Sequence, residues 1–205
     1  MAKPRRWVLD LETYYKDKTG DTDKYTLRHS TTTEYVCDDR WKLHGIAVLD
    51  PAGNASFEPE SSVASILAEI KPDDVVAAHN WAFDGYALAY HYGFRHWRVT
   101  DTLLLANAVL GPAADRGSGN SLGALAEELG FEAKGRLDPM EGVRDLSQDQ
   151  WDYLSLYAKG DARLCGQVYD ALLPRLSRAG LELWIMRHSL NLFIHRPIGV
   201  SSDRL

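Results

Sequence analysis

The pattern of hydrophobic and polar positions predicts a strand close to the beginning of the chain. In RWVLDL, residues 6–11, the apolar residues at positions 7, 9 and 11 fall on one face of an extended segment. Val8, Asp10 and Glu12, the residue that follows this segment, fall on the other face. One side of this strand is therefore expected to face a core, while the other presents two acids.

Beyond this strand, period-two and helical patterns alternate. Strands are expected at 42–49, 55–57, 75–78 and 98–100, the first two forming a hairpin around DPAG. Helices are expected at 61–70, 81–91, 102–110, 121–130, 147–173 and 181–193, with Asp101 and Ser121 as helix caps. This order predicts an α/β fold whose mixed sheet is antiparallel at its start and parallel later, flanked by helices.

Three segments lack a clear period. The polar stretch 13–40 is long enough to suggest an inserted functional loop rather than a connector. Residues 111–120 are rich in glycine, and residues 131–145 show neither strand nor helix spacing.

Composition adds limits to this picture. A chain of 205 residues, 45% hydrophobic and 25% charged, suits one main domain with a sizeable core. There is no run of eighteen apolar residues and no signal-peptide pattern, so we expect a soluble cytoplasmic protein with no membrane partner. Cys37 and Cys165 lack the spacing of a zinc site or a disulfide framework, which predicts two reduced thiols.

The acids of the first strand are the first candidates for chemistry. Asp10 and Glu12 share a face and are flanked by Leu9 and Leu11, so bringing their charges together is costly unless a cation neutralises them. A divalent metal would do so. The alternative is that both acids lie exposed on an edge strand.

Two further segments carry acids at helical spacing. In AAHNWAFD, Asn80 and Asp84 lie four residues apart at a helix start, although Asp84 alone would also fit a simple interaction with the helix dipole. In YAKGD, Tyr157 and Asp161 lie one helical turn apart, a spacing that is also common on helix surfaces. The combination and order of the three segments are more specific than any of them alone.

Together these segments resemble the DEDD exonuclease superfamily, in the branch with a tyrosine in its third motif. WVLDLET is similar to the first motif, HNWAFD to the second and YAKGD to the third, and the resemblance covers nearly the whole chain. It is strongest to the 3′–5′ proofreading domain of family A DNA polymerases, and residues 24–48 resemble bacteriophage members in particular. The resemblance implies a ribonuclease H-like fold.

The resemblance also implies a metal-dependent 3′–5′ exonuclease that releases nucleoside 5′-monophosphates by a two-metal mechanism. Asp10, Glu12, Asp84 and Asp161 would bind two Mg²⁺ or Mn²⁺ ions, which prefer oxygen ligands. Tyr157 would orient the attacking water.

Roles in substrate binding are implied less specifically. Thr13, with Glu12, would approach the terminal 3′ hydroxyl, and Asn80 would meet the strand. Tyr14, Tyr15 and Trp81 offer rings that either stack on bases or pack in the protein, and the sequence does not choose between these.

The same resemblance divides the chain into an exonuclease domain, residues 1–178, and a C-terminal helix and tail, 179–205, like the connection to a polymerase domain. The implied partners are DNA with a single-stranded or frayed 3′ end and a DNA polymerase, in proofreading during DNA replication. For a phage-encoded protein the location would be the host-cell cytoplasm. A net charge of −6 argues against tight autonomous DNA binding, since nucleic-acid binders usually carry a basic surface.

Two other functions fit part of the pattern. An RNA 3′-end trimming exonuclease would use the same metal site, because the motifs determine the reaction and not the sugar. A non-catalytic exonuclease-like module that binds DNA or a polymerase would be expected to lose acids, whereas this chain retains four acids and the tyrosine.

Overall fold

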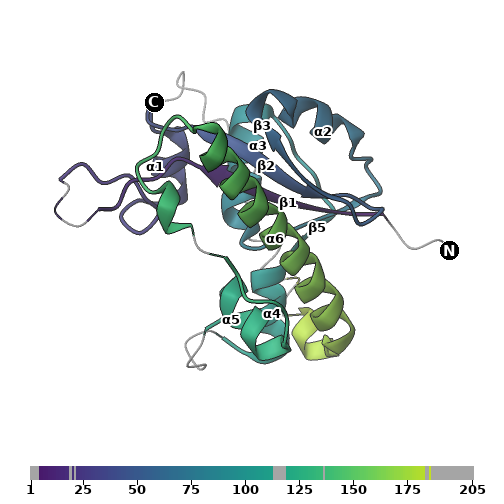
Figure 1. Ribbon diagram of the computed structural model, residues 1–205. Helices are drawn as coiled ribbons and strands as arrows, with labels where there is room; N and C mark the ends of the chain where they lie inside the picture. Colours follow the sequence, from purple (N-terminus) through teal and green to yellow (C-terminus); the bar gives the residue numbers. More distant parts are fainter. Residues whose placement is uncertain are drawn as a thin grey trace, which may run out of the picture.

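The computed structural model describes residues 5–18, 20, 22–112, 119–135, 137–182 and 185. Five strands form one sheet in the order β3-β2-β1-β4-β5 (Figure 1). They are β1 (Arg6–Thr13), β2 (Leu43–Leu49), β3 (Ala55–Pro59), β4 (Val75–Ala78) and β5 (Val99–Asp101). β1, β2 and β3 pair antiparallel, whereas β4 pairs parallel with β1 and with β5. The predicted mixed sheet, antiparallel first and parallel later, is confirmed.

α-Helices and short 3₁₀ helices surround the sheet, and residues 178–182 are also helical. The α-helices are α1 (Thr32–Cys37), α2 (Val63–Glu69), α3 (Trp81–Tyr92), α4 (Thr102–Leu110), α5 (Leu122–Leu129) and α6 (Gln148–Leu172). The 3₁₀ helices are η1 (Glu60–Ser62), η3 (Asp138–Met140) and η4 (Leu173–Arg175).

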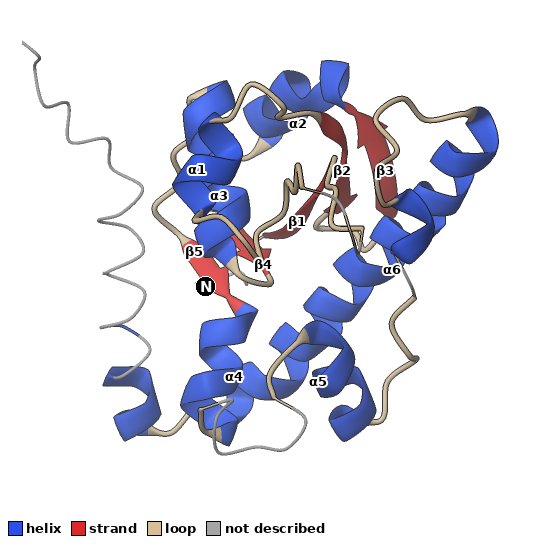
Figure 2. Ribbon diagram, turned by 90° about the vertical axis from the view of Figure 1, so that its left-hand side faces the viewer, coloured by secondary structure: helices blue, strands red, loops and turns tan. Residues whose placement is uncertain are grey.

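Alternation along β1 divides the interior into two cores. Trp7, Leu9 and Leu11 pack with buried residues of α1, α2 and α3 on one face of the sheet. Val8 packs with residues of α4, α5 and α6 on the other face (Figure 2). Burial of a single large aliphatic side chain stabilises a fold by about 1.5–3 kcal/mol, so a one-residue register slip of β1 would be strongly disfavoured.

Side-chain caps determine where the helices of the second core begin. Asp101 accepts hydrogen bonds from the backbone N–H groups of Leu103 and Leu104 in α4, and Ser121 caps α5, as predicted. Ser147 begins α6 with a capping box, in which its hydroxyl and the side chain of Gln150 bond each other's backbone N–H. The long helix that carries the third acidic motif thus has a defined start.

The polar stretch 13–40 is more ordered than the predicted loop. It contains α1, which begins with a capping box at Thr31. Tyr25 stacks on Tyr35 and on Tyr14, with ring centroids 4.3 and 5.8 Å away. These contacts join residues ten and eleven positions apart, beyond the reach of strand or helix periodicity, so local patterning could not predict them. A smaller correction is that the helix expected at 61–70 is divided into η1 and α2.

Most of the predicted helix 181–193, and most of the tail 179–205, lies outside the described residues. None of the described helices combines the length and the apolar character that a membrane-spanning helix requires.

Candidate active site

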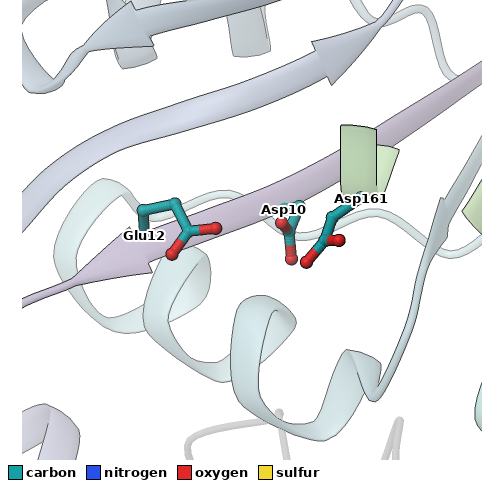
Figure 3. A group of neighbouring side chains, drawn as sticks. All are labelled: Asp10, Glu12 and Asp161. Atoms are coloured by element: carbon teal, nitrogen blue, oxygen red, sulfur yellow. The ribbon is translucent and has the colours of Figure 1, made fainter. Parts of the chain in front are cut away.

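Three carboxylates converge where β1 meets α6. Asp10 and Glu12 come from β1, Asp161 comes from α6, and one carboxylate oxygen of each lies within 4.8 Å of the others (Figure 3). Glu12 and Asp161 are only 6% and 4% exposed, and Asp10 is half-buried. The structure therefore brings together three of the four acids that the motifs predicted. Asp161 lies 149 residues after Glu12 in the sequence and 151 after Asp10.

Close packing of α6 on the sheet explains this convergence. Ala158 and Ala162, on either side of the acid, are fully buried in the second core. At Gly166 an added Cβ would lie only 2.8 Å from the Leu49 side chain of β2, so a larger residue would push the helix away. Small residues thus allow the Asp161 carboxylate to reach the acidic face of β1.

The cluster is electrostatically costly without cations. Burial, followed by the charge of Asp161, raises the pKa of Asp10 to about 7. Burial also raises the pKa of Glu12 well above its usual range, and the neighbouring Asp10 and Asp161 add to the effect. Lys134 forms an ion pair with Asp161, with Nζ 2.6 Å from Oδ2. Among the described residues, no other ion pair involves one of the four predicted acids.

Asp84 lies beside this cluster rather than inside the group of three. It sits in the first turn of α3, is 3% exposed, and accepts a hydrogen bond from the backbone N–H of Leu11 at 3.0 Å. Burial and then the charge of Asp10 raise its pKa. The second motif is thus electrostatically coupled to the first, across β1.

The turn before α3 is held by Asp101. Its carboxylate accepts hydrogen bonds from the backbone N–H groups of Asn80 and Trp81, both at 3.1 Å. Asn80 has φ +73°, the left-handed region that asparagine tolerates better than most residues, and its side chain makes no capping bond. The side-chain amide is therefore not used to cap α3, and its predicted role in substrate binding stays a prediction.

Tyr157 faces the acids from one turn earlier on α6. Burial, then the charges of Glu12 and Asp161, raise the pKa of its hydroxyl, so the group stays protonated at neutral pH. An added Cβ at Gly135 would lie 3.1 Å from the ring, which places the segment after α5 directly against it. The hydroxyl is thus held near the cluster as a hydrogen-bonding group rather than an anion.

The remaining predicted binding residues differ in their surroundings. The Thr13 hydroxyl is 2.9 Å from the Tyr35 hydroxyl, and the Tyr15 hydroxyl donates to the backbone oxygen of Leu137 at 3.2 Å. Trp81 is 3% exposed and belongs to the first core, so for this ring the packing alternative holds. Tyr14 is partly buried and stacks on Tyr25, at one end of the tyrosine stack of the 13–40 segment.

Sequence patterns missed Lys134. It follows α5 in the segment without periodicity and belongs to no motif, so only its position in three dimensions relates it to Asp161.

The residues present fit a divalent metal. The donors are carboxylate oxygens with no histidine or cysteine among them, which suits Mg²⁺ or Mn²⁺ rather than zinc. Burial, followed by the neighbouring carboxylates, raises the pKa values of Asp10 and Glu12, so a bound cation would lower the cost of ionising both acids. Asp10, Glu12 and Asp161 are the residues that could hold an ion.

Comparison with known proteins adds evidence on the fold. No family model matches the sequence, and no curated protein matches it. Among solved structures, Escherichia coli RNase D, described as an exoribonuclease involved in structured RNA processing, has a TM-score of 0.63 and 17% identity. The match covers 95% of this chain and 46% of RNase D, so this chain spans about half the length of that protein.

Two more structures are similar over most of this chain. Brucella melitensis NrnC with bound Mg²⁺ has a TM-score of 0.58 and 18% identity, covering 93% of this chain and 87% of NrnC. Trypanosoma brucei RNase D in complex with RNA U12 has a TM-score of 0.66 and 12% identity, covering 94% of this chain and 63% of that protein. At 12–18% identity these likenesses show the fold alone, and the expected ribonuclease H-like fold is confirmed.

Proposed function

We propose that this protein is a metal-dependent 3′–5′ exonuclease that hydrolyses phosphodiester bonds at nucleic-acid ends. The observation that carries the proposal is the convergence of Asp10, Glu12 and Asp161 on one desolvated point, in a fold shared with such exonucleases. Because fold alone does not assign chemistry, the acids supply the argument.

The residues of the site have three different roles in this proposal. Asp10, Glu12 and Asp161 hold divalent cation, and Asp84, coupled to Asp10 through space, contributes to a second position. Bound ions would supply the charge that generates hydroxide from water and stabilises the leaving 3′ oxygen. The Tyr157 hydroxyl, protonated and directed at the cluster, orients the attacking water by a hydrogen bond.

For the substrate we propose RNA with a single-stranded 3′ end. One similar structure is described as an exoribonuclease, and another holds RNA. A third structure is NrnC bound to pGG, with a TM-score of 0.57. These neighbours favour the RNA alternative over the DNA proofreading interpretation that the sequence resemblance placed first.

DNA remains the second candidate because of the motifs themselves. WVLDLET, HNWAFD and YAKGD resemble the proofreading domains of family A DNA polymerases, and the segment 24–48 resembles phage members. Under this candidate the 3′ end would be delivered by a polymerase, which would offset the weak binding expected of an acidic protein.

One experiment tests the activity and separates the two substrates. Single-stranded RNA and DNA of the same sequence, each labelled at the 5′ end, are incubated with the protein and Mg²⁺, Mn²⁺ or excess chelator. We expect a ladder that shortens from the 3′ end, nucleoside 5′-monophosphate as product, faster cutting of RNA, and no cutting with chelator. Faster cutting of DNA would favour the second candidate.

The matched control is Asp161→Asn, which keeps the shape of the side chain and removes its charge. Cutting that persists in this variant, or in thoroughly chelated wild-type protein, would show that a contaminant or another mechanism is responsible.

A further inference from the structure

Lys134 is an unexpected cation at the acid cluster. Its Nζ lies 2.6 Å from Asp161 Oδ2, the same carboxylate that converges with Asp10 and Glu12. Its charge acts on both of those acids, lowering their pKa values against the effect of burial. A single lysine therefore supplies the positive charge where the proposed function requires divalent cations.

The path of the side chain shows that this position is built by the fold. The stem passes over α5 at Gly123, where an added Cβ would lie 3.6 Å from the Lys134 Cβ. The ammonium lies 5.2 Å from the centroid of the Tyr157 ring. Gly135, the next residue, packs on the same ring. Contacts on both sides thus direct the ammonium to Asp161.

The ammonium also has room to move. The Lys134 side chain is 32% exposed, compared with 6% for Asp161. It borders a cavity of about 370 Å³ that continues along α6 past Tyr157, Gly160 and Arg163. A lysine stem has several rotatable bonds, so the head can leave the carboxylate for this cavity without a change in the backbone.

The ammonium and a metal ion would compete for the Asp161 carboxylate. A divalent ion bound by this cluster would place a second, larger positive charge within a few ångströms of Nζ, and like charges at that distance repel. The metal has the advantage, because it is bound by several carboxylates at once, whereas Lys134 pairs with one.

We propose that Lys134 is a displaceable counter-ion, which pairs with Asp161 in the metal-free protein and turns to the phosphate backbone of the substrate strand when metal binds. This inference rests on the proposed function and adds a residue to it. Lys134 then opposes metal binding and assists strand binding. A residue that merely supported the structure would assist both or neither.

The test uses Lys134→Met, which keeps most of the stem and removes the charge. Mn²⁺ affinity is measured by isothermal titration calorimetry without nucleic acid, and KM and kcat are measured on the labelled oligonucleotide at saturating Mn²⁺. We expect Mn²⁺ to bind about three- to tenfold more tightly, because the metal no longer has to displace the ammonium of a partly exposed ion pair. KM should rise by a similar factor, with kcat changed less than KM.

Two variants serve as controls. Lys159→Met removes the same charge two residues from Asp161, and its position on α6 points away from the face that carries Tyr157 and Asp161. It should leave Mn²⁺ affinity and KM unchanged. Lys134→Arg keeps the charge and should restore both quantities toward the wild-type values.

The outcomes distinguish this inference from the proposed function. If wild-type protein binds Mn²⁺ and degrades the oligonucleotide, but Lys134→Met binds Mn²⁺ equally or more weakly, the counter-ion role is overturned and the exonuclease stands. If wild-type protein neither binds Mn²⁺ nor cuts, the proposed function and the inference fall together.

Discussion

The single carboxylate of Asp101 and the cluster of three carboxylates are stabilised in different ways. Asp101 is 1% exposed and accepts hydrogen bonds from four backbone N–H groups, two at the start of α3 and two at the start of α4. Asp10, Glu12 and Asp161 converge with one lysine as their partner among the described ion pairs. Asp101 has its hydrogen-bond donors within the fold, whereas the three converging acids have one lysine to compensate their charges.

This difference separates a structural acid from functional ones. Backbone donors partly offset the burial that raises the pKa of Asp101, so its removal would leave four N–H groups without an acceptor. The three converging acids raise one another's energy in the metal-free protein, so their removal should relieve repulsion while abolishing chemistry.

The largest effect is expected for Asp161→Asn. The variant should lose exonuclease activity by at least about a thousandfold, equivalent to about 4 kcal/mol in the transition state, because a ligand shared by the cluster is lost. Its circular dichroism spectrum and thermal midpoint should match wild type or improve. A rate within tenfold of wild type would mean that Asp161 is not a metal ligand.

The opposite result is expected for Asp101→Ala. Stability should fall by about 2–4 kcal/mol, because buried N–H groups at two helix starts lose their acceptor. Urea unfolding at fixed pH measures this loss. At a temperature where the variant is folded, its activity should stay within tenfold of wild type. A loss of activity without a loss of stability would contradict the structural role of Asp101.

A smaller effect is expected for Tyr157→Phe. Hydrolysis should slow by about 10- to 100-fold, the size of a lost positioning hydrogen bond, while Mn²⁺ affinity is unchanged. Single-turnover rates at saturating metal, together with calorimetry, would measure the two effects separately. Loss of metal binding along with activity would contradict the proposed role in orienting water.

The smallest effect concerns the pH dependence of stability in metal-free protein. The folded-state pKa of Asp10 is raised from 3.8 to about 7, so its stabilising contribution is fully present below pH 3.8 and is lost as pH rises through 7. The neutral side chain of Asp10→Asn does not ionise, so this variant does not lose stability in this way as the pH rises. In chelator at pH 8 it should therefore be more stable than wild type by about 1–3 kcal/mol, with the gap narrowing toward pH 4. Urea unfolding at both pH values provides the comparison, and a gap that widens toward acid would reverse the sign of the argument.

The sequence predicted those features that depend on short-range periodicity. Alternation along β1 placed Asp10 and Glu12 opposite the apolar face, and helical spacing placed Tyr157 and Asp161 together. The cap at Asp101 followed from one residue at a strand-to-helix junction.

Features that depend on distant contacts were not predictable. Lys134 meets Asp161 only because α5 and α6 pack side by side, and nothing in the residues around it indicates this. The ring of Trp81 is buried through tertiary packing that its motif does not reveal. The order of the 13–40 segment likewise comes from tyrosines stacked across the insertion.

The central claim is that Asp10, Glu12 and Asp161 form a divalent metal site, and anomalous diffraction from crystals soaked in Mn²⁺ tests it most directly. The account predicts a peak between these three carboxylates, with the Lys134 ammonium moved away from Asp161. A cluster without a peak at Mn²⁺ concentrations that saturate binding in solution, or a peak bound by other residues, would contradict it.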